Sequence, residues 1–203
     1  KGDTVEKVVT VILILSLCLM PVQIQAKSVT SGTDDNGNKW TYNTSTKTLV
    51  FTGDKAISDF TLNGHDREPS WYRWSNKTEH IVIEEGITGI GSEAFSSFTE
   101  TKSITMGESV KRINRMAFWA NVSLKEIKLS SNITVIQGDA LSGGRELETI
   151  KLPMRLRKMC SLSGQEKLEK IVMPDSITNM QSAMFSECKK LKYIKLPAKI
   201  GEI

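Results

Sequence analysis

The sequence predicts a solenoid of stacked β coils, and three observations support this prediction. Apolar residues recur at a nearly constant interval in the second part of the chain, they do so in several separate columns, and the residues between them alternate as in a short strand. One column consists of isoleucines spaced by 23, 23, 23, 21 and 23 residues, namely Ile81, Ile104, Ile127, Ile150, Ile171 and Ile194. Internal similarity at a fixed period of this length is typical of repeat proteins, in which each unit packs only on its neighbours.

Each repeat begins with a short strand. The segment from Leu147 to Leu152 reads L-x-x-I-x-L, so Ile150 and Leu152 lie two residues apart. Period-two alternation predicts that these two side chains point into the core and that the residues beside them point outward. Two further apolar columns, six and nine residues after each isoleucine, predict a corner; in the first repeat they are Ile87 and Ile90.

The second half of each repeat predicts another corner, formed by a turn or a short helix. Its apolar column consists of Phe95, Phe118, Leu141, Leu162 and Phe185. A two-residue deletion between Met159 and Leu162 explains the 21-residue interval, after which the register recovers. No unit of this kind buries its apolar face alone, so stacking has to supply the core. The predicted fold is a leucine-rich-repeat solenoid with one strand and a turn or short helix in each 23-residue coil.

The repeat motif resembles that of a known family. The segment from Ile104 to Leu124 follows I-x-I-x-x-x-[IV]-x-x-I-x-x-x-A-F-x-x-[CN]-x-x-L, with Met106 in place of the second isoleucine, and Pro153, Pro174 and Pro197 come directly after predicted strands. This pattern is similar to the BspA-like leucine-rich repeats of bacterial surface proteins. Thr101, Gly144 and the short fourth unit depart from it. The resemblance implies a secreted or cell-surface protein that binds host or extracellular-matrix proteins.

Three regions are predicted along the chain. Residues 1–26 join a charged start, an apolar run from Val8 to Met20 and a small residue, Ala26, which is typical of a secretory signal peptide. An uncleaved membrane anchor is the alternative. Residues 27–80 lack the repeat and are expected to form an N-terminal β cap. Residues 81–203 contain five repeats and a truncated sixth.

The predicted cap contains a hairpin and an aromatic loop. Residues 39–42 and 48–51 are rich in β-formers and are joined by a polar stretch, which predicts a β-hairpin. Trp71, Tyr72 and Trp74 follow near Pro69. The end of a solenoid needs such a cover, so these rings are expected to seal it. The alternative is a platform on which sugar rings stack.

The sequence offers little for catalysis. Its 203 residues include two histidines, His65 and His80, and no recognisable nucleophile, phosphate-binding or metal-ligand motif. Cys160 and Cys188 are expected to be buried thiols rather than a disulfide. Residues 34–38 (DDNGN) superficially resemble a calcium loop but lack its later Gly and Glu, so a polar turn is favoured. We therefore predict no enzyme, no cofactor and no metal site.

The outward strand positions are the candidate binding face. They flank each repeat isoleucine and are His80, Val82, Ser103, Thr105, Glu126, Lys128, Thr149, Lys151, Lys170, Val172, Tyr193 and Lys195. Lys128, Lys151, Lys170 and Lys195 would form a basic stripe suited to an acidic protein or an anionic glycan. An ordinary solvated face is the alternative. Nucleic acid is not an expected partner, because a net charge of +4 in a mixed charge pattern comes with no base-reading motif.

The leading hypothesis is therefore a secreted or surface-displayed repeat module that adheres to host or matrix proteins. A glycan-binding or targeting module of a larger surface enzyme is the first alternative. A structural stalk that presents another domain is the second.

Overall fold

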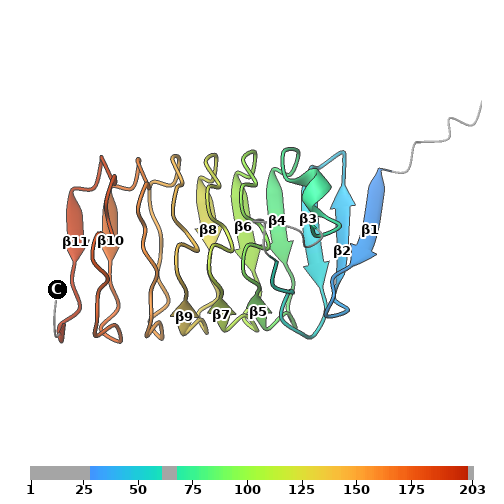
Figure 1. The fold of residues 1–203 in the computed structure, drawn as a ribbon. Helices are drawn as coiled ribbons and strands as arrows, with labels where there is room; N and C mark the ends of the chain where they lie inside the picture. Colours follow the sequence, from blue (N-terminus) through green and yellow to red (C-terminus); the bar gives the residue numbers. More distant parts are fainter. Residues whose placement is uncertain (1–27, 61–67, 201–203) are drawn as a thin grey trace, which may run out of the picture.

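The computed structural model describes residues 28–60 and 68–200, which form a long row of stacked coils (Figure 1). The predicted signal peptide at residues 1–26 and His65 lie outside the described residues. The elements in chain order are β1 Val29–Thr33, β2 Lys39–Asn43, β3 Thr48–Thr52, the 3₁₀ helix η1 Tyr72–Trp74, β4 His80–Ile83, β5 Gly89–Ile90, β6 Ser103–Met106, β7 Arg112–Ile113, β8 Glu126–Lys128, β9 Val135–Ile136, β10 Lys170–Val172 and β11 Tyr193–Lys195.

The strands of the described residues form three sheets: a long one along one side of the row, a narrower one along another side, and the two-stranded parallel sheet β10-β11 toward the C-terminal end. The first has the order β1-β2-β3-β4-β6-β8, antiparallel up to β3 and parallel from there on. The second, β5-β7-β9, is parallel throughout. Successive repeat isoleucines pair in register, as in Ile81 with Ile104 and Ile104 with Ile127. The predicted leucine-rich-repeat solenoid is confirmed.

The core runs through the inside of all the coils. The isoleucine column and the columns six and nine residues later are buried through most coils. A row of buried aromatic rings belongs to the same core. The Phe95 ring stacks on Phe118 with centroids 5.5 Å apart, and it meets Phe51 and Phe98 edge-on at 5.3 and 5.6 Å. Each ring therefore packs on neighbouring coils as well as its own, which makes the coils depend on one another for burial.

The corner around the Ala-Phe pair is a turn in every coil, and η1 is the one helical element among residues 28–60 and 68–200. The reason lies in the backbone hydrogen bonds. The amides of Glu93, Phe95 and Ser97 donate to carbonyls of the next coil at 2.7–3.0 Å, so they are not available for helical bonds within their own coil. Glu93 and Ser97 also have φ of 56° and 59°, a left-handed conformation that stops a right-handed helix.

Polar side chains join the coils at a second column near this corner. Asn121 Nδ2 donates to the Phe95 carbonyl at 3.1 Å, Gln165 Nε2 to the Leu141 carbonyl, and Cys188 Sγ to the Leu162 carbonyl at 3.2 Å. Gly144 occupies the same column without a side chain. A Cβ there would lie 2.5 Å from Gln165 Oε1, so the glycine makes room for this glutamine.

The N-terminal end contains the predicted hairpin and one strand that sequence reasoning missed. β2 and β3 pair antiparallel, with Trp40 opposite Phe51, and β1 pairs with the free side of β2. β3 in turn pairs parallel with β4, with Leu49 opposite Ile81. The hairpin is thus built directly into the solenoid sheet and extends its apolar column.

The turn at residues 34–38 and the two cysteines have the structures that the sequence favours. Asp34 accepts hydrogen bonds from the amides of Asn36, Asn38 and Ser58 at 2.8–3.2 Å and from Asn38 Nδ2 at 2.9 Å. Its carboxylate therefore holds a polar turn against the first coil. Cys160 and Cys188 are free thiols, the first buried and the second half-buried.

Candidate ligand-binding face

The twelve predicted strand-face residues occupy two parallel rows across the coils. The first row pairs His80 with Ser103 and Ser103 with Glu126, and resumes with Thr149 beside Lys170 and Lys170 beside Tyr193. The second row pairs Val82 with Thr105, Thr105 with Lys128, and Val172 with Lys195; Lys151 lies on the same repeat position. Thr48 and Val50 of β3 extend both rows toward the N-terminus, which sequence reasoning missed because β3 lies outside the repeat.

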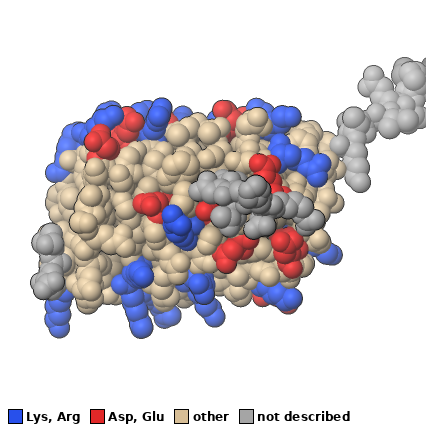
Figure 2. Space-filling model, viewed as in Figure 1, with Lys and Arg blue, Asp and Glu red and all other residues tan. Residues whose placement is uncertain are grey.

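The rows become more exposed toward the later coils. His80, Val82, Ser103 and Thr105 are half-buried, whereas every predicted face residue from Glu126 to Lys195 is exposed. Figure 2 shows Lys and Arg side chains projecting along the long edges of the molecule in the view of Figure 1. Of the predicted stripe, Lys170 is already engaged, since its Nζ lies 5.0 Å from the Tyr193 ring centroid. Lys128 and Lys151 remain as the exposed bases at the centre of the face.

A pocket of about 690 Å³ opens between these two lysines. Ile127, Leu129 and Leu152 line its apolar part, and Lys125, Lys128, Lys151 and Arg155 contribute positive charge. We call it the strand-face slot. It combines exposed apolar surface with a basic rim, which the repeat pattern alone does not reveal.

The aromatic group divides into one buried and two partly exposed rings. Trp71 is 1% exposed, and its ring meets Phe51 and Phe60 edge-on at 4.9 and 4.8 Å, so this ring seals the end of the core as expected and the alternative of a sugar-stacking surface does not hold for it. Tyr72 packs on Phe98 with centroids 6.0 Å apart. Trp74 stacks on Tyr42 at 4.3 Å and lines a second pocket of about 390 Å³, together with Lys47 and Glu79. Of the three rings, Trp74 is the one that lines this pocket.

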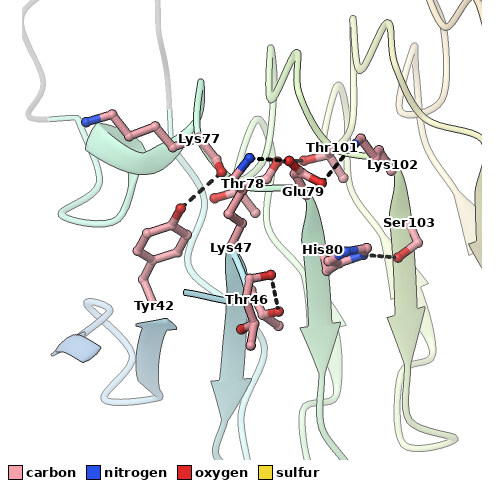
Figure 3. Close-up of polar contacts among 11 residues, drawn as sticks. Tyr42, Thr46, Lys47, Lys77, Thr78, Glu79, His80, Thr101, Lys102 and Ser103 are labelled. Atoms are coloured by element: carbon pink, nitrogen blue, oxygen red, sulfur yellow. Dashed lines mark hydrogen bonds and ion pairs between the residues drawn. The ribbon is translucent and has the colours of Figure 1, made fainter. Parts of the chain in front are cut away.

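Glu79 links the hairpin to the first two coils at the edge of this second pocket. Its carboxylate accepts from Lys47 Nζ and from Lys102 Nζ, each at 2.5 Å, and lies between them in Figure 3. The same figure shows His80 on β4 pointing to Ser103 on β6, with 2.8 Å between His80 Nδ1 and Ser103 Oγ. Two predicted face residues of the first coils, His80 and Ser103, are therefore occupied with each other.

The Glu79 cluster makes the stability of the first coils depend on pH. The two lysine ammonium groups, Lys102 first, lower the pKa of Glu79 to about 2 from its ordinary 4.5. A carboxylate with a depressed pKa stabilises the fold fully above pH 4.5, and this contribution disappears as the pH falls toward 2. We expect Glu79→Gln to melt below the wild type at pH 7, with the difference vanishing between about pH 4.5 and 2.

Thermal melts of both proteins across this pH range measure the effect. Added salt should shrink the pH 7 difference, because the cluster is partly exposed to solvent. A difference that stays constant down to pH 2 would assign the effect to packing of the side chain instead of its charge.

The described residues show no arrangement that favours catalysis. Burial raises the pKa of the Cys160 thiol to about 12, and burial also raises the pKa of Cys188, so neither is a thiolate nucleophile at neutral pH. Across residues 28–60 and 68–200, no three His, Cys, Asp or Glu side chains gather as metal ligands. No helix in the same ranges is long and apolar enough to cross a membrane.

Comparison with known proteins agrees with this architecture. Residues 68–163 and 160–203 match the sequence profile of the BspA type leucine rich repeat region in six copies. A leucine-rich repeat protein of T. pallidum has a similar fold, with 20% identity over 86% of this chain and 83% of that one, and a TM-score of 0.62. One from Bacteroides ovatus shares 17% identity over 88% of this chain, with a TM-score of 0.54.

The chain spans 54% of the Bacteroides ovatus protein and most of the T. pallidum one. Comparison with curated proteins finds no significant match. At these identities the two solved structures support the fold alone, whereas the sequence profile covers well over half of the chain and repeats in the register seen in the sheet. The chain belongs to the family of BspA-type leucine-rich repeat proteins.

Proposed function

We propose that the chain is a secreted or cell-surface module that binds extracellular proteins, and that its partners are host or matrix proteins. The observation that carries the proposal is the strand-face slot, where exposed Lys128 and Lys151 flank a hollow with an apolar part. Solenoids commonly bind along the extended surface that their strands create. An apolar centre with a charged rim is the composition of many protein interfaces.

Charge gives this face its preference for acidic partners. Glu108, one of two acidic residues at the slot, already accepts from the amide and hydroxyl of Ser131, each at 2.7 Å. The slot still carries a net positive charge, because four basic residues, Lys125, Lys128, Lys151 and Arg155, outnumber the two acidic ones, Glu108 and Glu126. Such a face speeds encounter with an acidic protein and loses this advantage as salt rises. Many copies on a surface would strengthen weak individual contacts through multivalency.

Binding of the purified protein to immobilised matrix proteins, at low and at physiological salt, tests the proposal. We expect saturable binding that weakens with salt, and about a tenfold loss of affinity in the double variant Lys128→Glu/Lys151→Glu. The charge-matched control is Lys111→Glu/Lys158→Glu, because both residues are exposed lysines on another side of the coils: Lys111 comes just before β7, and Lys158 pairs with Val135 of β9. Equal binding by the double variant and the wild type would exclude this face as the binding surface.

Glycan binding is the second candidate, and the pocket beside Trp74 favours it. Aromatic rings beside a carboxylate suit a sugar, and this pocket has Tyr42, Trp74 and Glu79 on its wall. A glycan array run with the same protein separates the two functions. Sugar binding lost in Trp74→Ala, with no matrix binding, would replace the protein-binding proposal. Absence of both would favour the structural stalk.

A further inference from the structure

A line of side chains beside the narrow sheet β5-β7-β9 alternates between bases and threonines. Backbone hydrogen bonds connect its members from coil to coil. The Thr88 amide donates to the Lys55 carbonyl at 3.2 Å, and the Lys111 amide donates to the Thr88 carbonyl at 3.0 Å. The Thr134 amide donates to the Lys111 carbonyl at 3.0 Å, and the Arg157 amide donates to the Thr134 carbonyl at 2.8 Å. We call Lys55, Thr88, Lys111, Thr134 and Arg157 the base–threonine row.

The bases of this row stand on every second coil. Hydrogen-bonded neighbours in a sheet lie about 4.8 Å apart, so Lys55, Lys111 and Arg157 follow one another at about 10 Å and together span about 19 Å. All three bases are exposed, and the threonines between them are half-buried. The row therefore presents regularly spaced positive charges with a hydroxyl group between each pair.

The adjacent repeat position adds two further bases. Arg112 of β7 pairs with Val135 of β9, and Val135 pairs with Lys158, so Arg112 and Lys158 lie beside Lys111 and Arg157 on the same two coils. Both are exposed. Figure 2 shows Lys and Arg side chains projecting along the lower edge of the molecule, where Figure 1 places β5, β7 and β9.

The positive charge of this face is largely uncompensated. The two repeat positions read KA, TG, KR, TV and RK at residues 55–56, 88–89, 111–112, 134–135 and 157–158, with five bases and no acid. Ion pairs between residues of the described ranges involve other lysines and Arg145. Arg112 Nε donates to Asn114 Oδ1 at 3.1 Å, and Asn114 Nδ2 donates to Asp59 at 2.9 Å, so Asp59 offsets charge at one of the five bases.

The same face has little apolar surface. None of the exposed large apolar side chains found in the described part of the chain stands at these two repeat positions, and Val135 is half-buried. Protein interfaces place apolar and aromatic side chains at their centre, and single-stranded nucleic acid needs aromatic rings on which its bases stack. A face of bases and hydroxyl groups without such residues fits a hydrated, linear polyanion instead.

We propose that this face binds a linear anionic glycan, a polysaccharide that carries sulfate or carboxylate groups, along the base–threonine row. Anionic groups of the glycan pair with Lys55, Lys111 and Arg157, and its hydroxyl groups hydrogen-bond to Thr88 and Thr134. The guanidinium of Arg157 suits a sulfate or carboxylate because it donates two parallel hydrogen bonds. This inference goes beyond the proposed protein-binding function, because it uses another side of the coils and another class of ligand.

Calorimetric titration of the full chain with heparin tests the inference. We expect Lys111→Glu/Lys158→Glu to lose at least about tenfold in affinity, and Lys128→Glu/Lys151→Glu, which changes the net charge equally, to lose less than about twofold. The two double variants are thus reciprocal controls for the two faces. Chemically desulfated heparin shows which anionic group is bound, since its carboxylates remain.

Chain length provides a second readout. Heparin fragments should gain affinity until they are about 19 Å long and change little beyond that length, because the row then has no further base to contact. Lys55→Glu should weaken fragments long enough to reach it and leave fragments shorter than about 10 Å unaffected. Affinity that rises steadily with length, with the same loss in Lys55→Glu at every length, would indicate diffuse charge attraction and would overturn the inference.

The other outcomes separate this inference from the proposed function. Absence of heparin binding, equal binding by Lys111→Glu/Lys158→Glu and the wild type, or equal affinity for heparin, polyglutamate and duplex DNA would overturn it. Heparin binding that is lost in Lys128→Glu/Lys151→Glu instead would also overturn it and would move the anion site to the strand-face slot. None of these results affects binding of matrix proteins at the slot, which is measured separately.

Discussion

Replacement of Trp71 by alanine should destabilise the protein by about 3–5 kcal/mol. The Trp71 ring is buried among Phe51, Phe60 and Phe95, and its Nε1 donates to the Ala94 carbonyl at 3.0 Å. The substitution therefore leaves a cavity and also removes the donor from a buried carbonyl, which adds to the cost. Urea unfolding followed by circular dichroism measures the change in the free energy of unfolding.

Trp119 provides the matched control for this substitution. It is the same residue type, but 38% of it is exposed at a corner of the solenoid. Trp119→Ala should change the free energy of unfolding by about 1 kcal/mol or less. Similar losses in the two variants would contradict the assignment of Trp71 as the residue that seals the first coil. Trp71→Ala therefore cannot serve as a test of sugar binding, and Trp74→Ala is the appropriate variant.

Replacement of Phe95 by alanine should cost a similar amount, about 3–5 kcal/mol, and should act across several coils. The Phe95 ring contacts Phe51 of β3, Phe98 of its own coil and Phe118 of the next one. Because the coils have no independent cores, weakening one contact between coils weakens its neighbours as well. We expect the urea transition of Phe95→Ala to broaden or divide, since the first coils lose their coupling to the rest.

Phe95→Leu is the conservative control, because the same column contains Leu141 and Leu162 in later coils. This variant should lose only about 1–2 kcal/mol and keep a single transition. Hydrogen exchange locates the change: in Phe95→Ala, protection should fall first for amides in β4 and β6. Uniform loss of protection along the whole chain would argue against coil-by-coil coupling.

On the strand face, the sequence pattern predicts which residues point outward, and the tertiary structure shows which of these residues contact one another. The repeat identifies which residues point outward, and the observed register places them in two rows. The repeat pattern does not reveal which of these outward side chains contact one another. His80 hydrogen-bonds to Ser103 and Lys170 lies over Tyr193, so these side chains are less available than Lys128 and Lys151. Such pairs depend on rotamers and on neighbours 23 residues away, which the alternation of a strand does not specify.

The sequence by itself determined the coil length, the buried columns and the in-register strands, because apolar side chains at a strict period become buried when the units stack on one another. It also determined the hairpin over β2 and β3, because two runs of β-forming residues flank a polar turn there. The tertiary structure decided that the second corner is a turn, since alternate amides there, such as those of Glu93, Phe95 and Ser97, bond to carbonyls of the next coil. It also decided where the sheet is interrupted. The residues at the slot, Glu126 to Leu129 and Thr149 to Leu152, follow the repeat as well as any others. Whether two adjacent strands pair depends on how the whole of each coil closes, and that closure is a property of the stacked structure and not of the local sequence.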